Sequence, residues 1–279
     1  MDPRSRDDAM LRTSNLRKTF NAGTVNEVQA LRGVSLDVPE GAFVLVLGGN
    51  GSGKSTLLNA VAGTFPLDQG RVLLAGQDIT RWQEHRRARL MGRVFQNPFS
   101  GTAPSMSIAE NFALAARRGK RRGLGAALGK SLRRELADRV RELRMGLEDR
   151  LDSAIGSLSG GQRQALTLLM ATWLEPALLL LDEHTAALDP KSADLVVRLT
   201  EEVVSRHNLT TLMVTHSMQQ AVNLGDQIVM MHRGLVAHRF VGAEKQRLRV
   251  EDLLMRFEEL RRRELLDETA AALLQESYV

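Results

Sequence analysis

The chain has 279 residues, and its 43% content of hydrophobic residues is enough for a real core, which argues against disorder. It contains 38 Lys and Arg against 33 Asp and Glu, so its formal charge is +5, and the isoelectric point of about 10.0 leaves nucleic acid open as a partner. The lack of cysteine excludes a disulfide scaffold and any cysteine-based zinc site or nucleophile. Residues 1–8 lack the apolar region of a signal peptide, and the longest apolar run, residues 165–174, is too short for a membrane span. We therefore expect a soluble chain that forms one large α/β domain, with or without a subdomain.

Strands and helices are expected to alternate along the chain. In chain order, we predict strands at 10–18, 30–38 and 42–47, a helix at 54–62, strands at 71–74 and 93–95, helices at about 131–145 and 162–174, a strand at 178–181, a helix at 190–206, a strand at 210–215, a hairpin at 227–241 and an amphipathic helix from 250. The segment 97–157 has no strong strand, and we interpret it as a helical insertion. This alternation favours an α/β fold with a largely parallel sheet.

A glycine-rich segment lies between a predicted strand and a predicted helix. Residues 48–55 read GGNGSGKS and match the phosphate-binding pattern G-x-x-x-x-G-K-[ST] in the context that the pattern requires. The glycines let successive backbone N–H groups point at one anion, and the helix N-terminus adds partial positive charge. We expect Lys54 to reach the β and γ phosphates of a nucleotide and the Ser55 hydroxyl to hold Mg²⁺. The flanking strand and helix argue against a plain surface loop.

Two adjacent carboxylates, Asp182 and Glu183, follow the apolar strand predicted at 178–181. Ligands bind at the carboxyl ends of strands in open α/β sheets. Asp182 can hold Mg²⁺ through a water, and Glu183 can accept a proton from an attacking water. An isolated pair of this kind is more often a strand end that meets solvent. The phosphate-binding pattern in the same chain makes the functional interpretation the favoured one.

A second glycine motif, LSGGQ at residues 158–162, precedes the apolar helix. Ser159 is a plausible N-cap, and Gly160 and Gly161 leave backbone N–H groups open to an anion. The motif therefore indicates a second phosphate-binding helix start, although a plain capped helix would be the default if it stood alone.

The order of these motifs resembles that of the ATP-binding subunit of ABC transporters, over about residues 11–242. The resemblance implies a P-loop NTPase fold of the ABC type, α/β with a mostly parallel core sheet, an N-terminal antiparallel β region and a helical subdomain at about 97–175. Residues 1–10 would then be a polar tail, and residues 243–279 a helical extension.

The resemblance also assigns roles to residues. It implies that Glu183 is the catalytic base, that Gln96 contacts Mg²⁺ and senses a membrane partner, and that His216 is the switch histidine. Phe20 would stack on adenine, and Asp189 would belong to the Asp loop. Without the resemblance, the ordinary interpretation would make Phe20 a core residue and His216 a surface residue. The expected catalytic residues are Glu183, His216, Lys54 and Gln96, and the expected Mg²⁺ ligands are Ser55, Gln96 and Asp182. The expected contacts of ATP are Phe20, Gly48, Asn50, Gly51, Ser52, Gly53, Lys54, Ser55, Thr56, Gln96, Ser159, Gly160, Gly161, Gln162, Asp182, Asp189 and His216.

Two positions depart from the family pattern. His184 stands before Thr185 where the family usually has Pro, and Gly49 stands where Pro is common. The nucleotide-facing motifs are intact, so no loss of activity is inferred. The segment DEHTAALDP at 182–190 resembles an importer subgroup that includes tryptophan or tyrosine systems.

The resemblance implies several partners. Because each chain has one phosphate loop and one LSGGQ, two copies are expected to pair head to tail on ATP and to drive a separate permease, with an extracytoplasmic solute-binding protein as a further partner. Import is favoured over export. A nucleic-acid ATPase is disfavoured because Gln96 and Ser159 are only 63 residues apart, too close for a long coiled coil. A binding module without catalysis is disfavoured by the intact Lys54, Glu183 and His216.

The basic charge is concentrated in one region. Residues 117–144 contain eleven Lys or Arg and three acidic residues, a local charge of +8, so the rest of the chain carries −3 of the total of +5. A solvated face is the ordinary explanation. The sharper hypothesis is that this region faces anionic lipid beside the permease, at the cytoplasmic face of the membrane, and that nucleic acid is not a partner.

Overall fold

The computed structural model describes residues 9–119 and 129–262. Most of the predicted tail at 1–10 and the last part of the predicted extension at 243–279 lie outside the described residues. The predicted domain boundaries remain predictions.

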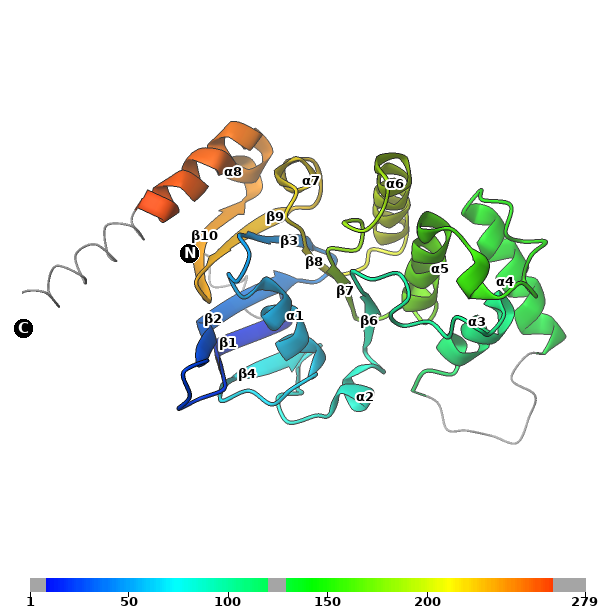
Figure 1. Cartoon of the computed structure of the whole chain (residues 1–279), viewed down its shortest axis with the longest axis horizontal. Helices are drawn as coiled ribbons and strands as arrows, with labels where there is room; N and C mark the ends of the chain where they lie inside the picture. Colours follow the sequence, from blue (N-terminus) through cyan, green and yellow to red (C-terminus); the bar gives the residue numbers. More distant parts are fainter. Residues whose placement is uncertain (1–8, 120–128, 263–279) are drawn as a thin grey trace, which may run out of the picture.

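A six-stranded sheet with the strand order β10-β9-β3-β8-β7-β6 forms the centre of the molecule (Figure 1). Its strands are β3 (Phe43–Gly48), β6 (Met91–Val94), β7 (Leu178–Asp182), β8 (Thr211–Val214), β9 (Gln227–His232) and β10 (Leu235–Val241). Neighbours from β9 to β6 run parallel, and β10 pairs antiparallel with β9 as the predicted hairpin. Every residue of β3 is buried, as expected for a strand covered on both faces. The α/β prediction with a mostly parallel sheet is confirmed.

A four-stranded antiparallel sheet lies beside the central sheet, in the order β2-β1-β4-β5. Its strands are β1 (Ala9–Phe20), β2 (Val28–Pro39), β4 (Gln69–Leu74) and β5 (Gln77–Asp78). Helix α1 (Lys54–Ala62) contacts strands of both sheets, and Leu57, Leu58 and Val61 join them in one apolar core. The predicted N-terminal antiparallel β region is therefore present, and it holds α1 against the central sheet.

A buried arginine fixes the far end of α1. Arg87, at the end of the short helix α2 (Glu84–Arg87), is 2% exposed. Its Nη1 donates to the carbonyl oxygens of Ala60 (2.9 Å) and Val61 (2.7 Å), while Nε and Nη2 donate to those of Trp82 and Thr80. Burial lowers the pKa of Arg87, and the carbonyl oxygens at the helix end offset the cost of burying its charge.

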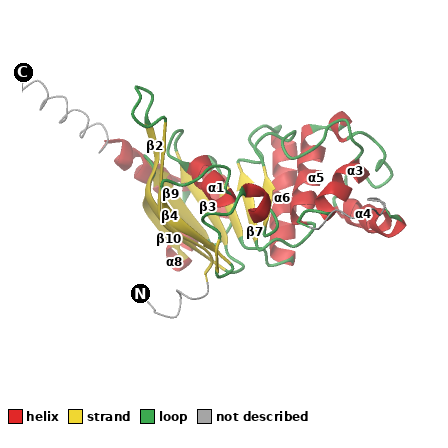
Figure 2. Cartoon of the chain, turned by 90° about the horizontal axis from the view of Figure 1, so that it is seen from below, coloured by secondary structure: helices red, strands yellow, loops and turns green. Residues whose placement is uncertain are grey.

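Four helices lie beyond β6 and β7 in both views (Figures 1 and 2). They are α3 (Ile108–Ala116), α4 (Lys130–Glu142), α5 (Gly160–Thr172) and α6 (Pro190–Arg206). Phe112 of α3 packs edge to face on Trp173 with ring centroids 5.4 Å apart, and α4 buries Leu136 and Val140 in the same core. The insertion predicted between the strands is thus helical in its described part.

The C-terminal part of the described region is also helical. Two short helices, α7 (Met218–Asn223) and α8 (Gly242–Arg247), flank the β9–β10 hairpin, and residues 250–262 form a further helix. Leu253 of that helix is fully buried, and Phe257 and Leu260 pack against the core, which matches the predicted amphipathic pattern. Over residues 9–119 and 129–262, no helix is long and apolar enough to cross a membrane.

Candidate functional site

The candidate site forms where β3, β8, β7 and β6 end. These strands pair in parallel with their neighbours, so their carboxyl ends share one edge of the sheet. The glycine-rich loop follows β3, Glu183 follows β7, and Gln96 and His216 each lie two residues beyond the end of β6 and β8. Residues far apart in the sequence are thereby brought to the edge where ligands bind in open α/β sheets.

The glycine-rich loop connects β3 to α1 through backbone that only glycine adopts readily. Gly51 and Gly53 have φ values of 74° and 98°, in the left-handed region. A Cβ on Gly48 would lie 2.5 Å from the carbonyl oxygen of Met231 in β9, so this position has no room for a side chain. Within the loop and the first turn of α1, Gly49, Asn50, Gly51 and Ser55 are exposed, Thr56 is half-buried, and Gly48, Ser52, Gly53 and Lys54 are buried.

The ammonium group of Lys54 lies inside this loop. Its Nζ donates to the carbonyl oxygens of Gly48 (2.9 Å) and Gly49 (3.0 Å) and lies 3.9 Å from Oε1 of Glu183. Burial lowers the pKa of Lys54, and the charges of Glu183 and Asp182 oppose that shift. The loop therefore encloses a cation at the start of a helix, which is an arrangement for binding phosphate.

Ser55 and Asp182 provide a set of oxygen atoms beside the loop. Ser55 Oγ donates to Oδ1 of Asp182 at 3.1 Å, and Nη2 of Arg93 lies 3.9 Å from Oδ2 of the same carboxylate. Burial raises the pKa of Asp182, while the hydrogen bond from Ser55 and the charge of Arg93 act against the rise. Hydroxyl and carboxylate oxygens are ligands that Mg²⁺ prefers, so Ser55 and Asp182 fit the predicted ion, and the side chain of Gln96 reaches the neighbouring Glu183.

The carboxylate of Glu183 is the meeting point of the predicted catalytic residues. Its Oε2 accepts a hydrogen bond from Nε2 of Gln96 at 3.3 Å and lies 3.4 Å from Nδ1 of His216, while Oε1 is the atom nearest Lys54. Glu183 has a φ of 42°, an uncommon value for a residue with a side chain, and its N–H donates to the carbonyl of Val214. The four predicted catalytic residues thus lie together.

The LSGGQ residues form a separate group within the chain. Ser159 caps α5 in a capping box, in which Gln162 N donates to Ser159 Oγ and Ser159 N donates to Gln162 Oε1, both at 3.2 Å. Gly161 lies so close to α6 that a Cβ would be 2.8 Å from Cβ of Ser192. Because α5 and α1 lie on opposite sides of β6 and β7, this group is apart from the glycine-rich loop (Figure 1).

Two further predicted contacts take part in local interactions. The half-buried Phe20 packs edge to face on Phe65 with centroids 5.2 Å apart, and Nζ of Lys18 lies 5.6 Å from each ring centroid. Asp189 is the N-cap of α6 and accepts a hydrogen bond from Ser192 N; hydrogen bonding to the side chain and then to the backbone of Ser192 lowers the pKa of Asp189. Phe20 therefore belongs to an aromatic and cationic cluster, and Asp189 fixes the start of α6.

Sequence reasoning missed two residues of this region. Arg93, in β6, approaches Asp182 and donates to Oδ1 of Asn59 at 2.5 Å; only the parallel pairing of β6 with β7 brings it there. His184 was noted as a departure from the pattern, but its burial was not foreseen. It is 1% exposed, with Nε2 at 3.0 Å from Oγ1 of Thr200.

A cavity of about 680 Å³ extends from the outer side of the glycine-rich loop. His216 and Met218 line it together with the loop, and Leu254, Phe257 and Arg261 of the helix at 250–262 form the opposite wall. The C-terminal helix thus borders the candidate site.

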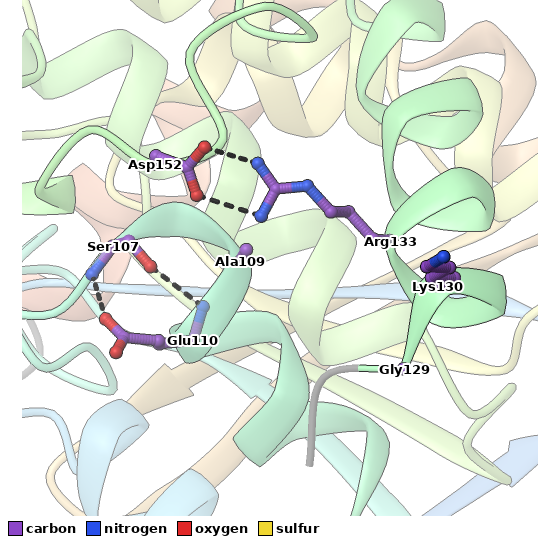
Figure 3. A pocket seen from close by; sticks show the side chains of 7 residues that line it. All are labelled: Ser107, Ala109, Glu110, Gly129, Lys130, Arg133 and Asp152. Atoms are coloured by element: carbon purple, nitrogen blue, oxygen red, sulfur yellow. Dashed lines mark hydrogen bonds and ion pairs between the residues drawn. The ribbon is translucent and has the colours of Figure 1, made fainter. Parts of the chain in front are cut away.

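A pocket between α3 and α4 differs in character (Figure 3). Arg133 binds Asp152 through both of its terminal nitrogens, and Ser107 and Glu110 pair in a capping box. These polar groups satisfy one another, within the start of α3 and between α4 and the loop residue Asp152, so they offer little to a ligand.

A strand, a glycine-rich loop around a buried lysine, a helix and an adjacent strand-end carboxylate define a P-loop nucleotide-binding protein. The family model described as ABC transporter matches residues 31–186, more than half of the chain. The chain therefore belongs to the ABC transporter ATP-binding family.

Known proteins agree with this assignment. The tyrosine transport ATP-binding protein of Clostridioides difficile strain R20291 is 41% identical over 249 residues, which are 89% of this chain and 99% of the relative. The sulfate/thiosulfate import ATP-binding protein CysA of Nocardia farcinica strain IFM 10152 is 36% identical over 81% of this chain, and the match spans 63% of that relative. The dimeric structure of MJ0796, a bacterial ABC transporter cassette, superposes with a TM-score of 0.71 at 28% identity, covering 83% of this chain and 98% of that chain.

Proposed function

We propose that this chain binds and hydrolyses ATP with Mg²⁺ as the energising subunit of an ABC transporter. The observation that carries the proposal is the Glu183 carboxylate in contact with Gln96, His216 and Lys54. A carboxylate surrounded in this way can orient a water and accept its proton, while the neighbouring groups stabilise negative charge on a phosphoryl group.

Binding of ATP uses the loop and its lysine. Lys54 already forms hydrogen bonds within the loop, so its ammonium is in place to bind the β and γ phosphates beside the N–H groups at the start of α1. Phe20 stacks on adenine. Ser55, Asp182 and Gln96 would hold Mg²⁺, which when bound neutralises charge on the phosphates.

Hydrolysis then proceeds at the γ phosphate. Glu183 accepts a proton from water, the water oxygen bonds to the γ phosphorus, and the bond to the bridging oxygen breaks to release ADP and phosphate. His216, whose ring is mostly exposed next to Glu183, donates a hydrogen bond to the transferring group. Gln96 keeps the Glu183 carboxylate turned toward the water.

Two copies of the chain complete the site. Ser159, Gly160, Gly161 and Gln162 are apart from the glycine-rich loop within one chain, so they act on the nucleotide of a partner copy in a head-to-tail pair with two-fold symmetry. The dimeric MJ0796 cassette supports this arrangement. Asp189, at the start of α6, faces the partner in the same pair.

The energy of hydrolysis drives a separate permease, and the solute is an imported small molecule of the amino-acid class. The relative named for tyrosine transport supports an amino-acid solute, and the relative named for sulfate/thiosulfate import supports the direction of transport. An extracytoplasmic solute-binding protein delivers the solute to the permease. The chain works as a peripheral subunit at the cytoplasmic face of the membrane.

The basic region at 117–144 contacts anionic lipid beside the permease. Lys120, Arg121 and Arg122 of this region lie outside the described residues. Neutralising them together with Arg117 and Arg118 is expected to weaken sedimentation with vesicles of anionic lipid and to leave nucleotide binding unchanged. Unchanged sedimentation would refute the lipid contact.

The proposed ATPase activity is tested with the purified protein. Wild type should hydrolyse ATP only with Mg²⁺, and Glu183→Gln should lose nearly all turnover and form an ATP-dependent dimer on size-exclusion chromatography. The matched control is Glu202→Gln, an exposed carboxylate of α6 that pairs with Arg206 outside the Glu183 cluster. If Glu183→Gln hydrolyses ATP at a rate close to that of wild type, Glu183 is not the catalytic base.

A further inference from the structure

The segment that carries Gln96 is fastened to helix α5 at both of its ends. Nε2 of Gln164 donates to the carbonyl oxygen of Phe95 at 3.1 Å, on one side of Gln96. On the other side, the ring of Phe99 lies over the guanidinium of Arg163, whose central carbon is 3.6 Å from the ring centroid. Consecutive residues of the LSGGQ helix therefore hold both ends of the Gln96 segment.

Arg163 is also the residue that holds the chain leading into Ser159. It is 4% exposed, and its guanidinium donates to the carbonyl oxygens of Ile155 (3.3 Å), Gly156 (3.2 Å) and Leu158 (2.8 Å). These carbonyls belong to the single turn at 155–157 and to the residue that precedes the N-cap. A buried cation that binds three carbonyls fixes the conformation of this segment.

Phe99 covers the open face of this cation. The side chain of Phe99 is 51% exposed, although a phenylalanine without a specific partner is favoured in the core. The negative face of an aromatic ring attracts a guanidinium, and the carbonyl oxygens bind the same guanidinium along its edges. A cavity of about 590 Å³ opens beside the contact, lined by residues 96–99 and Gly160, so the stacked pair lies across an opening between the two segments.

We propose that Phe99 and Arg163 link the Gln96 segment to the Ser159 segment, and that Phe99 is a positioning residue for the pairing of two copies on ATP. Displacement of residues 96–99 then pulls on Arg163, and Arg163 shifts the carbonyls that set the position of Ser159. The Glu183 carboxylate of one copy is thereby coupled, through Gln96, to the surface that the same copy offers to its partner. The part played in pairing rests on the proposed function; the link itself does not.

The link is tested first in the single chain without nucleotide. Hydrogen exchange is measured for the backbone amides of residues 155–158 in wild type, Phe99→Leu, Phe99→Tyr and Leu114→Ala. Leu114 is the matched control, because it is also an exposed apolar residue of the helical side, at 58%, and it makes no ring contact with a cation. Loss of the aromatic face in Phe99→Leu should speed exchange by about fivefold, whereas Phe99→Tyr and Leu114→Ala should match wild type.

The second measurement concerns pairing in the Glu183→Gln background. Phe99→Leu should raise the ATP concentration needed for half-maximal dimer formation by about fivefold while ATP affinity of the monomer stays constant, and Phe99→Tyr should restore dimer formation. Wild-type exchange in Phe99→Leu, or equally fast exchange in Leu114→Ala, would overturn the link. Faster exchange with unchanged pairing would overturn the positioning role alone. If the Glu183→Gln variant itself does not dimerise on ATP, the result would count against the proposed function and against the positioning role. The hydrogen-exchange result would still test the link between Phe99 and Arg163.

Discussion

Gln96 donates a hydrogen bond to the carboxylate of Glu183 at 3.3 Å although 87 positions separate the two residues. The cause is the register of two parallel strands: Val94 of β6 pairs with Leu181 of β7, and each polar residue lies two positions further along its own strand direction. The amide and the carboxylate therefore leave the sheet edge side by side. The geometry of this pair therefore depends on the pairing of β6 with β7.

We predict that Gln96→Ala lowers kcat for ATP by roughly tenfold or more, because the Glu183 carboxylate loses the group that orients it. The KM for ATP should change much less, since the loop and Lys54 are untouched. Steady-state ATPase assays measure both constants. Gln83→Ala is the control, because Gln83 is an exposed amide that makes no side-chain cap on α2. A rise in KM at constant kcat would contradict the orienting role.

Removal of the charge of Asp182 should weaken Mg²⁺ binding. Asp182→Asn keeps the shape of the half-buried side chain that Ser55 contacts, but it removes the negative charge that would neutralise a divalent cation. The Mg²⁺ concentration for half-maximal ATPase activity should rise by roughly 10- to 100-fold. Asp138→Asn, on the exposed face of α4, should leave it unchanged. Equal Mg²⁺ requirements in both variants would remove Asp182 from the ligand set.

His184 should make the free energy of unfolding depend on pH. Thr200 Oγ1 donates to Val196 O, so it can only accept from Nε2 of His184, and Nδ1 is buried without a hydrogen-bond partner among the described residues. Burial lowers the pKa of His184 from 6.5 to about 4. The unfolded chain then binds the extra proton, so stability is full above pH 6.5 and falls by up to about 3 kcal/mol as the pH drops toward 4.

Urea denaturation at several pH values between 7 and 4 measures this slope. Other groups also titrate in this range, so the comparison is with His184→Gln, which retains a donor for Thr200 and has no titrating ring. The variant should lose less stability than wild type between pH 6.5 and 4. Parallel curves for the two proteins would contradict a buried neutral imidazole.

Gly161→Ala should destabilise the packing of α5 on α6 by roughly 1–3 kcal/mol, because the added Cβ meets the side chain of Ser192. Denaturant titration measures the loss. Gly129→Ala is the control, since a Cβ there contacts nothing within 4 Å. Addition of Ser192→Gly to Gly161→Ala should recover part of the stability, and a double variant no better than the single one would show that the crowding lies elsewhere.

The features that depend only on neighbouring residues in the sequence were predicted from local sequence patterns. The glycine-rich loop, the buried strand before Asp182 and the cap at Ser159 each follow from a few consecutive residues, and the sheet class follows from the alternation of elements. Helix α3 was not predicted as an element, although Ser107 and Glu110 have the capping-box spacing that could have revealed it.

The remaining features depend on residues that meet only in the folded chain. The burial of Arg87 could not be predicted, because its partners are the free carbonyls at the end of α1, 26 and 27 positions away. Stacking of Phe99 on Arg163 likewise has no signal in either segment. Charged residues ordinarily lie at the surface, and hydrogen bonds to backbone carbonyls stabilise the burial of both Arg87 and Arg163.

Arg87 has a consequence for how the molecule can move. Four hydrogen bonds from one guanidinium tie the last turn of α1 to the region of Thr80 and Trp82, while the loop around Lys54 ties its first turn to β3. Helix α1 is thus pinned at both ends, with a positive charge at each, and it cannot slide along its axis without breaking this set of bonds. We therefore expect α1 to stay fixed to the two sheets, and any movement during ATP turnover to occur in the helices beyond β6 and β7, which include the LSGGQ helix α5.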